Sequence, residues 1–452
     1  MKWFAYAATT AALVGVLGGC GGGGGGGGGG LPFPVVPSTP MTLAVQVNGK
    51  AVTADAGGKY SIKPGDTVTL TPNQGTGWNN SSTPAGSVSL RKAAISSSQW
   101  SAQIVNNTAA AAVFTVSAKA SADAAQVKDA VFNVSAGNAS NGTYSVFATN
   151  GTRQKLALNF DAQFYVMTDN AGVAVEDSFS TDLSEAGTYL FQSSRNTAKA
   201  INTRFRMVTD TVVGSFPFEA AGVPNTYAVQ PFVASRALVT KQSDLDGDYN
   251  RLGIGALASV RDSNIRQARV TGGGTVFLLC NEVAITAPAS CPPASVLTYN
   301  VTPGATPDAW NIARVTDPTD TGTFSIARVA GKNVYLSAGT NPRAPNDALF
   351  RIGLVESSTW GATTASGGDT AGRWGTLKFT ATTYETILAQ PDATVYAVGY
   401  PLNITSASIA GIKGINQSGT DRYFGAQDGT ISAVVGARGG PVAGYIQIGL
   451  VN

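Results

Sequence analysis

From Met41 onward, hydrophobic and polar residues alternate over short stretches that end in turn residues. In TLAVQV, the side chains of Leu43, Val45 and Val47 fall on one face, and Asn48-Gly49 follows as a hairpin signal. The segment 63–71 places a Pro-Gly-Asp turn before another alternating run. This period of two predicts β-strands. Further runs of the same kind are 99–106, 112–118 and 130–136.

Strands at this spacing over about a hundred residues predict a β-sandwich at residues 41–137. The pattern resembles a bacterial immunoglobulin-like domain, and the resemblance implies Trp78 or Trp100 as its core aromatic residue. Two further β-rich regions are expected at residues 141–240 and 241–452. The whole folded part is therefore expected to be all-β.

A glycine followed by Thr or Ser and then an apolar residue recurs along both later regions, as in GTY at 142 and 187. The later intervals are near fifty residues, the length of a propeller blade, which leaves a propeller open. The earlier intervals are 45, 27 and 60 residues and hold no period. An antiparallel meander or barrel is therefore preferred. The stretch GDYN (247–250) is similar to the strand opening of lipocalin-like barrels.

The first nineteen residues have the order of an export signal: Lys2, an apolar stretch over 7–16, and then small residues. Leu-Gly-Gly-Cys at 17–20 resembles the lipobox of bacterial lipoproteins. That resemblance implies cleavage after residue 19 and attachment of diacylglycerol and fatty acid, such as palmitate, to Cys20. Gly21 stands where an aspartate tends to retain lipoproteins at the inner membrane. The outer membrane is therefore the expected location, facing either the periplasm or the cell surface.

The segment 20–40 reads as a tether. Ten glycines follow Cys20 and form a flexible coil that spans somewhat under ~20 Å. LPFPVVPSTP (31–40) has four prolines and favours an extended, stiffer conformation. Together these segments hold the folded part away from the membrane.

The composition restricts the chemistry more than it defines it. The chain has 452 residues and no histidine, which excludes Ser-His-Asp catalysis and His-ligated zinc. Charged residues make up 13% and the net charge is +3, with no basic run, so nucleic acid is not an expected partner.

Two groups of residues suggest a disulfide bond and a metal site. Cys280 and Cys291 are expected to form a disulfide in an exported protein; a redox or metal site would need closer spacing or further ligands. Asp244, Asp246 and Asp248 alternate as in calcium loops. Tyr249 and Gly255 occupy the positions where an EF-hand needs glycine and an acid, so a turn is the preferred interpretation, with calcium as the alternative.

The candidate ligand-binding residues are Trp360 and Trp374, at the ends of a polar, glycine-rich stretch expected to be a loop. Exposed tryptophans there would stack on a glycan or anchor a protein partner, but tryptophans at strand ends are more often core residues or hairpin pairs.

Two functions are weighed. The first is a non-catalytic envelope lipoprotein with a structural, adhesive or ligand-binding role and no cofactor. The second is a polysaccharide hydrolase that uses a carboxylate pair, with Asp161, Asp177 and Glu185 as examples of the acids available. The first is preferred, because no nucleophile constellation accompanies the architecture.

Overall fold

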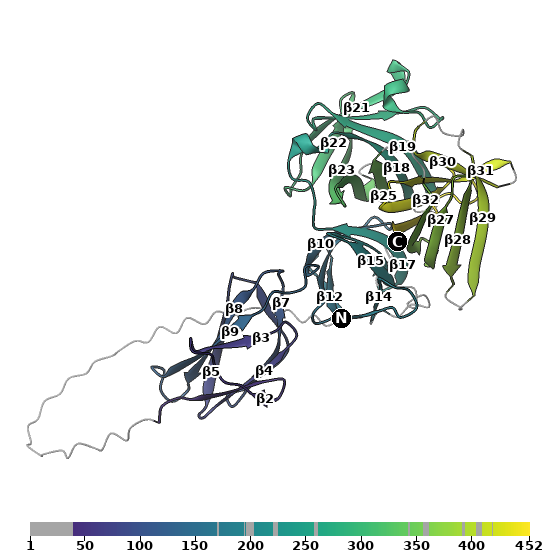
Figure 1. The fold of residues 1–452 in the computed structure, drawn as a ribbon. Helices are drawn as coiled ribbons and strands as arrows, with labels where there is room; N and C mark the ends of the chain where they lie inside the picture. Colours follow the sequence, from purple (N-terminus) through teal and green to yellow (C-terminus); the bar gives the residue numbers. More distant parts are fainter. Residues whose placement is uncertain are drawn as a thin grey trace, which may run out of the picture.

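The computed structural model is built from β-strands and a few short 3-10 helices, so the protein is all-β (Figure 1). It forms a two-sheet sandwich followed by three closed barrels. The structure describes the following residues: 39–169, 171–193, 195, 203–219, 225–256, 261–341, 344–355, 361–390, 394–403, 409–417 and 419–452.

The sandwich consists of two sheets over a common apolar core. One sheet has the order β2-β1-β4-β7-β6 and the other β3-β9-β8-β5. Trp100 is fully buried in this core beside Phe114, which confirms it as the core aromatic residue, while Trp78 lies partly buried at its edge. The strands are β1 (Leu43–Val47), β2 (Lys50–Ala51), β3 (Lys59–Ile62), β4 (Thr67–Pro72), β5 (Thr76–Thr83), β6 (Val88–Ile95), β7 (Trp100–Asn106), β8 (Ala112–Ala120) and β9 (Val127–Val134).

Each barrel has eight strands in chain order, and its last strand pairs with its first. Barrel 1 comprises β10 (Gly142–Ala148), β11 (Arg153–Asn159), β12 (Phe164–Thr168), β13 (Ala174–Thr181), β14 (Thr188–Phe191), β15 (Arg204–Val208), β16 (Thr211–Glu219) and β17 (Tyr227–Ser235). Barrel 2 comprises β18 (Gly247–Ala256), β19 (Arg261–Thr271), β20 (Val276–Cys280), β21 (Val296–Pro303), β22 (Trp310–Arg314), β23 (Asp317–Val329), β24 (Lys332–Asn341) and β25 (Ala344–Val355). Barrel 3 comprises β26 (Thr363–Asp369), β27 (Trp374–Phe379), β28 (Thr383–Ala389), β29 (Val395–Asn403), β30 (Ile412–Gln417), β31 (Thr420–Gln427), β32 (Ile431–Gly436) and β33 (Ile446–Val451). The 3-10 helices are η2 (Gln242–Leu245), η3 (Pro288–Ser290) and η4 (Pro293–Ser295).

This division corrects the expectation of a single region at 241–452, which holds two barrels. Each barrel takes up roughly a hundred residues, twice the interval of the repeated glycine motif. At 142 and 187 the motif lies where β10 and β14 begin, but at 214 and 322 it lies inside β16 and β23, so it does not mark propeller blades. GDYN does open a barrel: Gly247 begins β18, and the buried Tyr249 hydroxyl donates to the carbonyl of Leu245. Tyr144 does the same in barrel 1 with Ser140.

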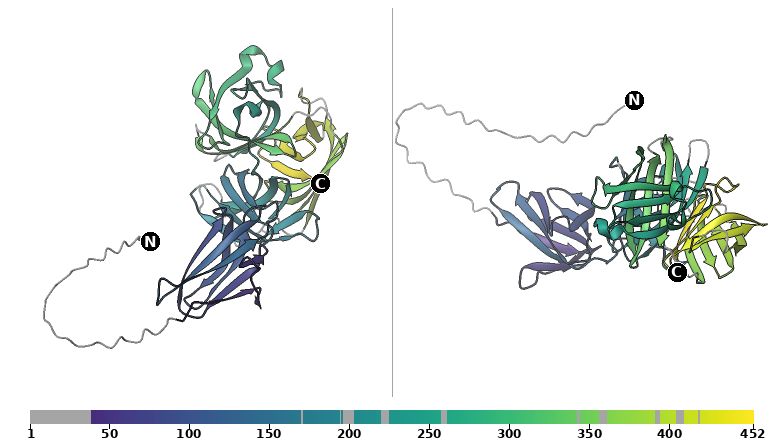
Figure 2. Two further views of the ribbon diagram at one scale, coloured as in Figure 1. Left: turned by 60° about the vertical axis from the view of Figure 1, so that its left-hand side comes forward. Right: turned by 90° about the horizontal axis from the view of Figure 1, so that it is seen from above.

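The three barrels are joined by an apolar core that lies outside all of them. Its members come from the outward faces of barrel 1 (Phe147, Val213, Val233), barrel 2 (for example Phe350 and Ile352) and barrel 3 (for example Ile446 and Ile448). β32, which faces this core on one side and the interior of barrel 3 on the other, is buried at every residue. We call this set of residues the central core. Figures 1 and 2 show the three barrels gathered around it, with the sandwich projecting from barrel 1.

The sandwich is attached to barrel 1 by a polar joint. Asp161 accepts hydrogen bonds from the backbone of Asn138 at 2.8 Å and the side chain of Asn141 at 2.6 Å. Arg91 of the sandwich pairs with Glu176 of barrel 1 at 2.7 Å. The joint therefore has defined contacts from both units.

Candidate functional site

The lipidation prediction falls on residues that the structure does not describe. Cys20 and the tether lie before residue 39, outside the described part of the chain. Among the described residues, no helix has the length and apolar character needed to cross a bilayer.

The disulfide prediction is confirmed. Cys280 and Cys291 are bonded, with their Cα atoms 5.7 Å apart. The bond closes the connection between β20 and β21, which contains both η3 and η4. This connection lies at one end of barrel 2.

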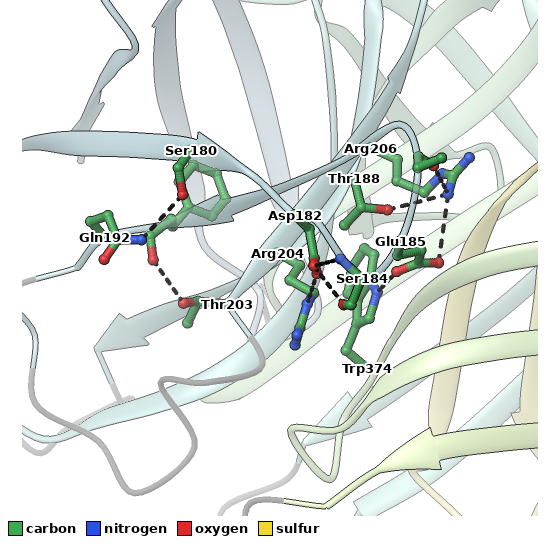
Figure 3. A network of polar contacts seen from close by, with 12 residues as sticks. Ser180, Asp182, Ser184, Glu185, Thr188, Gln192, Thr203, Arg204, Arg206 and Trp374 are labelled. Atoms are coloured by element: carbon green, nitrogen blue, oxygen red, sulfur yellow. Dashed lines mark hydrogen bonds and ion pairs between the residues drawn. The ribbon is translucent and has the colours of Figure 1, made fainter.

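The tryptophan prediction needs correction. The stretch 359–375 is not one loop, because Thr363–Asp369 forms β26 and a tight turn leads to β27. Trp374 is only 3% exposed and faces barrel 1, where its indole nitrogen donates to Glu185 at 2.9 Å (Figure 3). Its ring is therefore used in an interface between barrels and offers no open stacking surface. Trp360 lies outside the described residues.

The three aspartates of DLDGDYN have separate partners. Asp244 pairs with Arg328 at 3.3 Å, Asp248 pairs with Arg269 at 2.6 Å, and Asp246 accepts from the backbone of Gly273 and Gly274. No group of three or more metal-binding side chains occurs in the described part of the chain. The aspartates thus anchor turns and strands, in line with the preferred turn interpretation.

The acids considered for a hydrolase are also used structurally. Glu185 lies between Trp374 and Arg206, with its ion pair to Arg206 at 3.5 Å (Figure 3). Asp161 belongs to the joint described above, and Asp177 accepts from the backbone of Ser178. Neighbouring Asp182 pairs with Arg204; burial alone would raise its pKa, but hydrogen bonds from Ser184 and Arg204 lower it.

The interior of barrel 2 is closed at one end. Leu245 of η2 and Val239 belong to its internal apolar cluster, although both precede the first strand of the barrel. The indole of Trp310 donates to the Val239 carbonyl at 3.3 Å and fixes this closure. The rings of Phe277, Phe324 and Tyr335 pack against one another inside the barrel, next to this closed end. At the opposite end, which we call the mouth, lie the disulfide connection and the turn between β22 and β23.

Four arginines take the inward positions of barrel 2 between this aromatic layer and the mouth. Arg251 and Arg266 face each other across β18 and β19, Arg351 pairs in register with Gly253, and Arg314 with Tyr299. Any side chain at Gly253 would collide with that of Arg351, so glycine makes room for the guanidinium. We call these four residues the arginine cluster.

Few of the charges in the arginine cluster are neutralised. Arg251 is 8% exposed, bonds to Asn264 at 3.3 Å, and has no hydrogen-bond partner for its buried Nε. Arg351 and Arg266 donate to backbone carbonyls, those of Ile254 and Cys280 among them. Within the described residues, none of these three contacts a carboxylate. Arg314 reaches Asp320 at 3.9 Å and also leaves its Nε without a partner.

The proximity of these groups lowers the pKa of two of them. Burial and the nearby charge of Arg251 lower the pKa of Arg351 to about 9. Burial, Arg251 and Arg438 lower the pKa of Arg266. Arg438 pairs with Asp262 at 3.7 Å near the mouth, and this ion pair has no net charge.

Sequence reasoning missed the arginine cluster. In RLGIG (251–255) and FRIGL (350–354), alternation suggests that Leu, Ile and Phe point into the barrel and arginine points to solvent. The apolar residues point out instead, into the central core, and the arginines point in. The available signal was the glycine two residues after each arginine, on the same face of the strand, because it leaves room inside the barrel for a large side chain.

Comparison with known proteins gives little further guidance. No family model matches the chain, and no curated protein matches it. One solved structure, a quinoprotein alcohol dehydrogenase-like protein from Bacteroides thetaiotaomicron, aligns at 10% identity over 88% of this chain and 97% of that one. The TM-score of this alignment is 0.17.

Proposed function

We propose that this protein is a lipid-anchored lipoprotein of the outer membrane that binds a ligand without transforming it. Cys20 carries the lipid, residues 21–40 form the tether, and an immunoglobulin-like sandwich extends the reach of the three barrels. The observation that carries the proposal is the form of barrel 2, which is closed at one end and lined with unneutralised donors toward the other. The membrane, through the lipid, and a glycan or protein ligand are its partners.

The hydrolase alternative lacks comparable support. The acids named for it are held by Asn141, Ser178 and Arg206, at three separate places in the chain. A glycosidase needs two carboxyl groups about 5–10 Å apart on either side of a bound sugar. Nothing in the arrangement of these three favours such a pair.

Anchoring is tested with Cys20→Ser in the full chain. We expect the substitution to abolish fatty-acid labelling and to release the protein from the membrane fraction, because every acyl chain of the anchor is attached through Cys20 and is lost with it. A control substitution of Ser38→Ala in the tether should leave both unchanged. A Cys20→Ser protein that is still labelled and sediments with membranes would contradict the proposal.

Ligand binding is tested with the purified full chain on arrays of glycans and envelope polymers, with hydrolysis products measured in parallel. Binding without product release is the expected result. Release of shortened glycans would favour the hydrolase.

A further inference from the structure

The arginine cluster is charged in a place where charge is costly. Moving an ion away from water costs several kcal/mol unless a partner of opposite charge compensates for the loss. Arg251 lies deepest, and its charge acts on both Arg266 and Arg351. Hydrogen bonds to neutral carbonyls and to Asn264 satisfy some donors but leave the repulsion among the guanidiniums.

The carboxylates near the cluster do not balance it. Asp320 is shared between Arg314, at 3.9 Å, and the hydroxyl of Tyr299, at 3.1 Å. Asp262 acts on Arg351 at longer range but is paired with Arg438. Among the described residues, the four inward-facing arginines therefore have only Asp320 as a nearby counter-ion, and Asp320 is shared with Tyr299, which leaves an excess of positive charge between the aromatic layer and the mouth.

The exposure of the charged side chains rises toward the mouth. The side chains of Arg314 and Asp320 are 31% and 32% exposed, whereas Arg251 below them is buried. The closed end, sealed by Leu245 and Val239, lies on the opposite side of the aromatic layer. A solute that enters from the mouth would thus meet Arg314 first and Arg251 last.

We propose that the mouth of barrel 2 is a binding site for a small multivalent oxyanion, a polycarboxylate or a phosphate. Planar guanidiniums bind both groups through paired N–H donors, and the unpartnered Nε atoms of Arg251 and Arg314 supply donors that are already oriented. The ring faces of Phe277 and Tyr335, each 6.0 Å from the Arg251 guanidinium, hold it in place from below. The inference rests on the proposed ligand-binding function and assigns barrel 2 an anionic ligand, a narrower class than the glycan or protein ligand named there.

The disulfide supports this site from the side. Arg266 donates to the carbonyls of Cys280 and Glu282, and the Cys280–Cys291 bond closes the connection that contains both. The position of one guanidinium at the mouth therefore depends on a covalently closed segment.

Isothermal titration of the full chain with citrate and with inorganic phosphate, against a sodium chloride background of equal ionic strength, tests the inference. We expect saturable binding of at least one of the two anions, and the stronger one identifies the class. Arg251→Gln should weaken it about tenfold to a hundredfold, because a charge-assisted hydrogen bond is lost. Asp320→Asn should strengthen it, because the competing acid is removed. No saturable binding by either anion would overturn the inference.

Arg328→Gln is the matched control. It removes one positive charge from the same barrel, but Arg328 is 45% exposed and pairs with Asp244 beside η2, near the closed end. Its affinity should equal that of the unmodified chain; an equal loss in Arg328→Gln and Arg251→Gln would mean a nonspecific charge effect and would overturn the site.

A thermal melt without multivalent anions separates binding from a structural role. If Arg251 is kept for a ligand, Arg251→Gln should melt at the same temperature or higher, because repulsion with Arg266 and Arg351 is relieved. A lower melting temperature together with unchanged anion affinity would overturn the inference. Should Arg251→Gln fail to fold, the anion affinities of Asp320→Asn and Arg351→Gln test the site instead. The first substitution should raise the affinity and the second should lower it.

These outcomes are independent of the proposed function. Glycan or protein binding by a chain that binds neither citrate nor phosphate would preserve the ligand-binding lipoprotein and refute the oxyanion site. Anion binding by a chain that cells do not lipidate would support the oxyanion site and refute the lipoprotein.

Discussion

The central core predicts that the three barrels unfold together, and Phe350→Ala tests this. Phe350 is fully buried on the outward face of β25, in a core to which barrels 1 and 3 also contribute. Truncating a buried phenylalanine removes its transfer free energy and leaves a cavity, at a cost of about 3–5 kcal/mol. This corresponds to a rise of roughly two to four orders of magnitude in the unfolding equilibrium constant.

Hydrogen exchange shows which barrels lose stability in the Phe350→Ala variant. Because the cavity lies among all three barrels, we expect faster exchange of the slowest amides in barrels 1, 2 and 3, by factors that are similar in each. The control is Ile387→Ala, on an outward position of barrel 3 that is 56% exposed, which should change stability by less than about 0.5 kcal/mol. Faster exchange confined to residues 247–355 would show that the barrels are independent and that the central core does not couple them.

Two further predictions concern covalent and protonation equilibria. Replacing Cys280 and Cys291 with serine should cost roughly 3 kcal/mol, since a loop of about a dozen residues gains freedom when unfolded; chemical denaturation with probes in barrel 2 measures it, and an unchanged midpoint would refute the estimate. Burial raises the pKa of Tyr144, Tyr165 and Tyr249 to about 12 from 10.0. The unfolded chain ionises first, so the stability that these groups contribute is full below pH 10 and is lost as the pH rises through 12. Tyrosinate absorbance should therefore rise together with unfolding, and separate ionisation of these tyrosines in the folded protein would contradict the burial.

Sequence alone determined the features that depend on local chemistry. Alternation predicted strands, and strands were found; Asn48 and Gly49 take positive φ at the predicted hairpin turn. The all-β class and the Cys280–Cys291 bond followed from strand pattern and from cysteine number in a chain that is expected to be exported, and both are confirmed. These features need only neighbours in the chain.

The tertiary structure alone decided which face of each strand is the inside. The two-residue period of a β-strand places the side chains of Arg251 and Leu252 on opposite faces, but it does not determine which of the two points into the barrel. Because three barrels pack through their outer walls, the apolar face of β18 and β25 turns outward to the central core and the arginines turn inward. The same packing buries Trp374 against Glu185, where the sequence left both an exposed and a buried ring open. The candidate site was therefore out of reach of the sequence, since its polarity is set by contacts between strands a hundred residues or more apart.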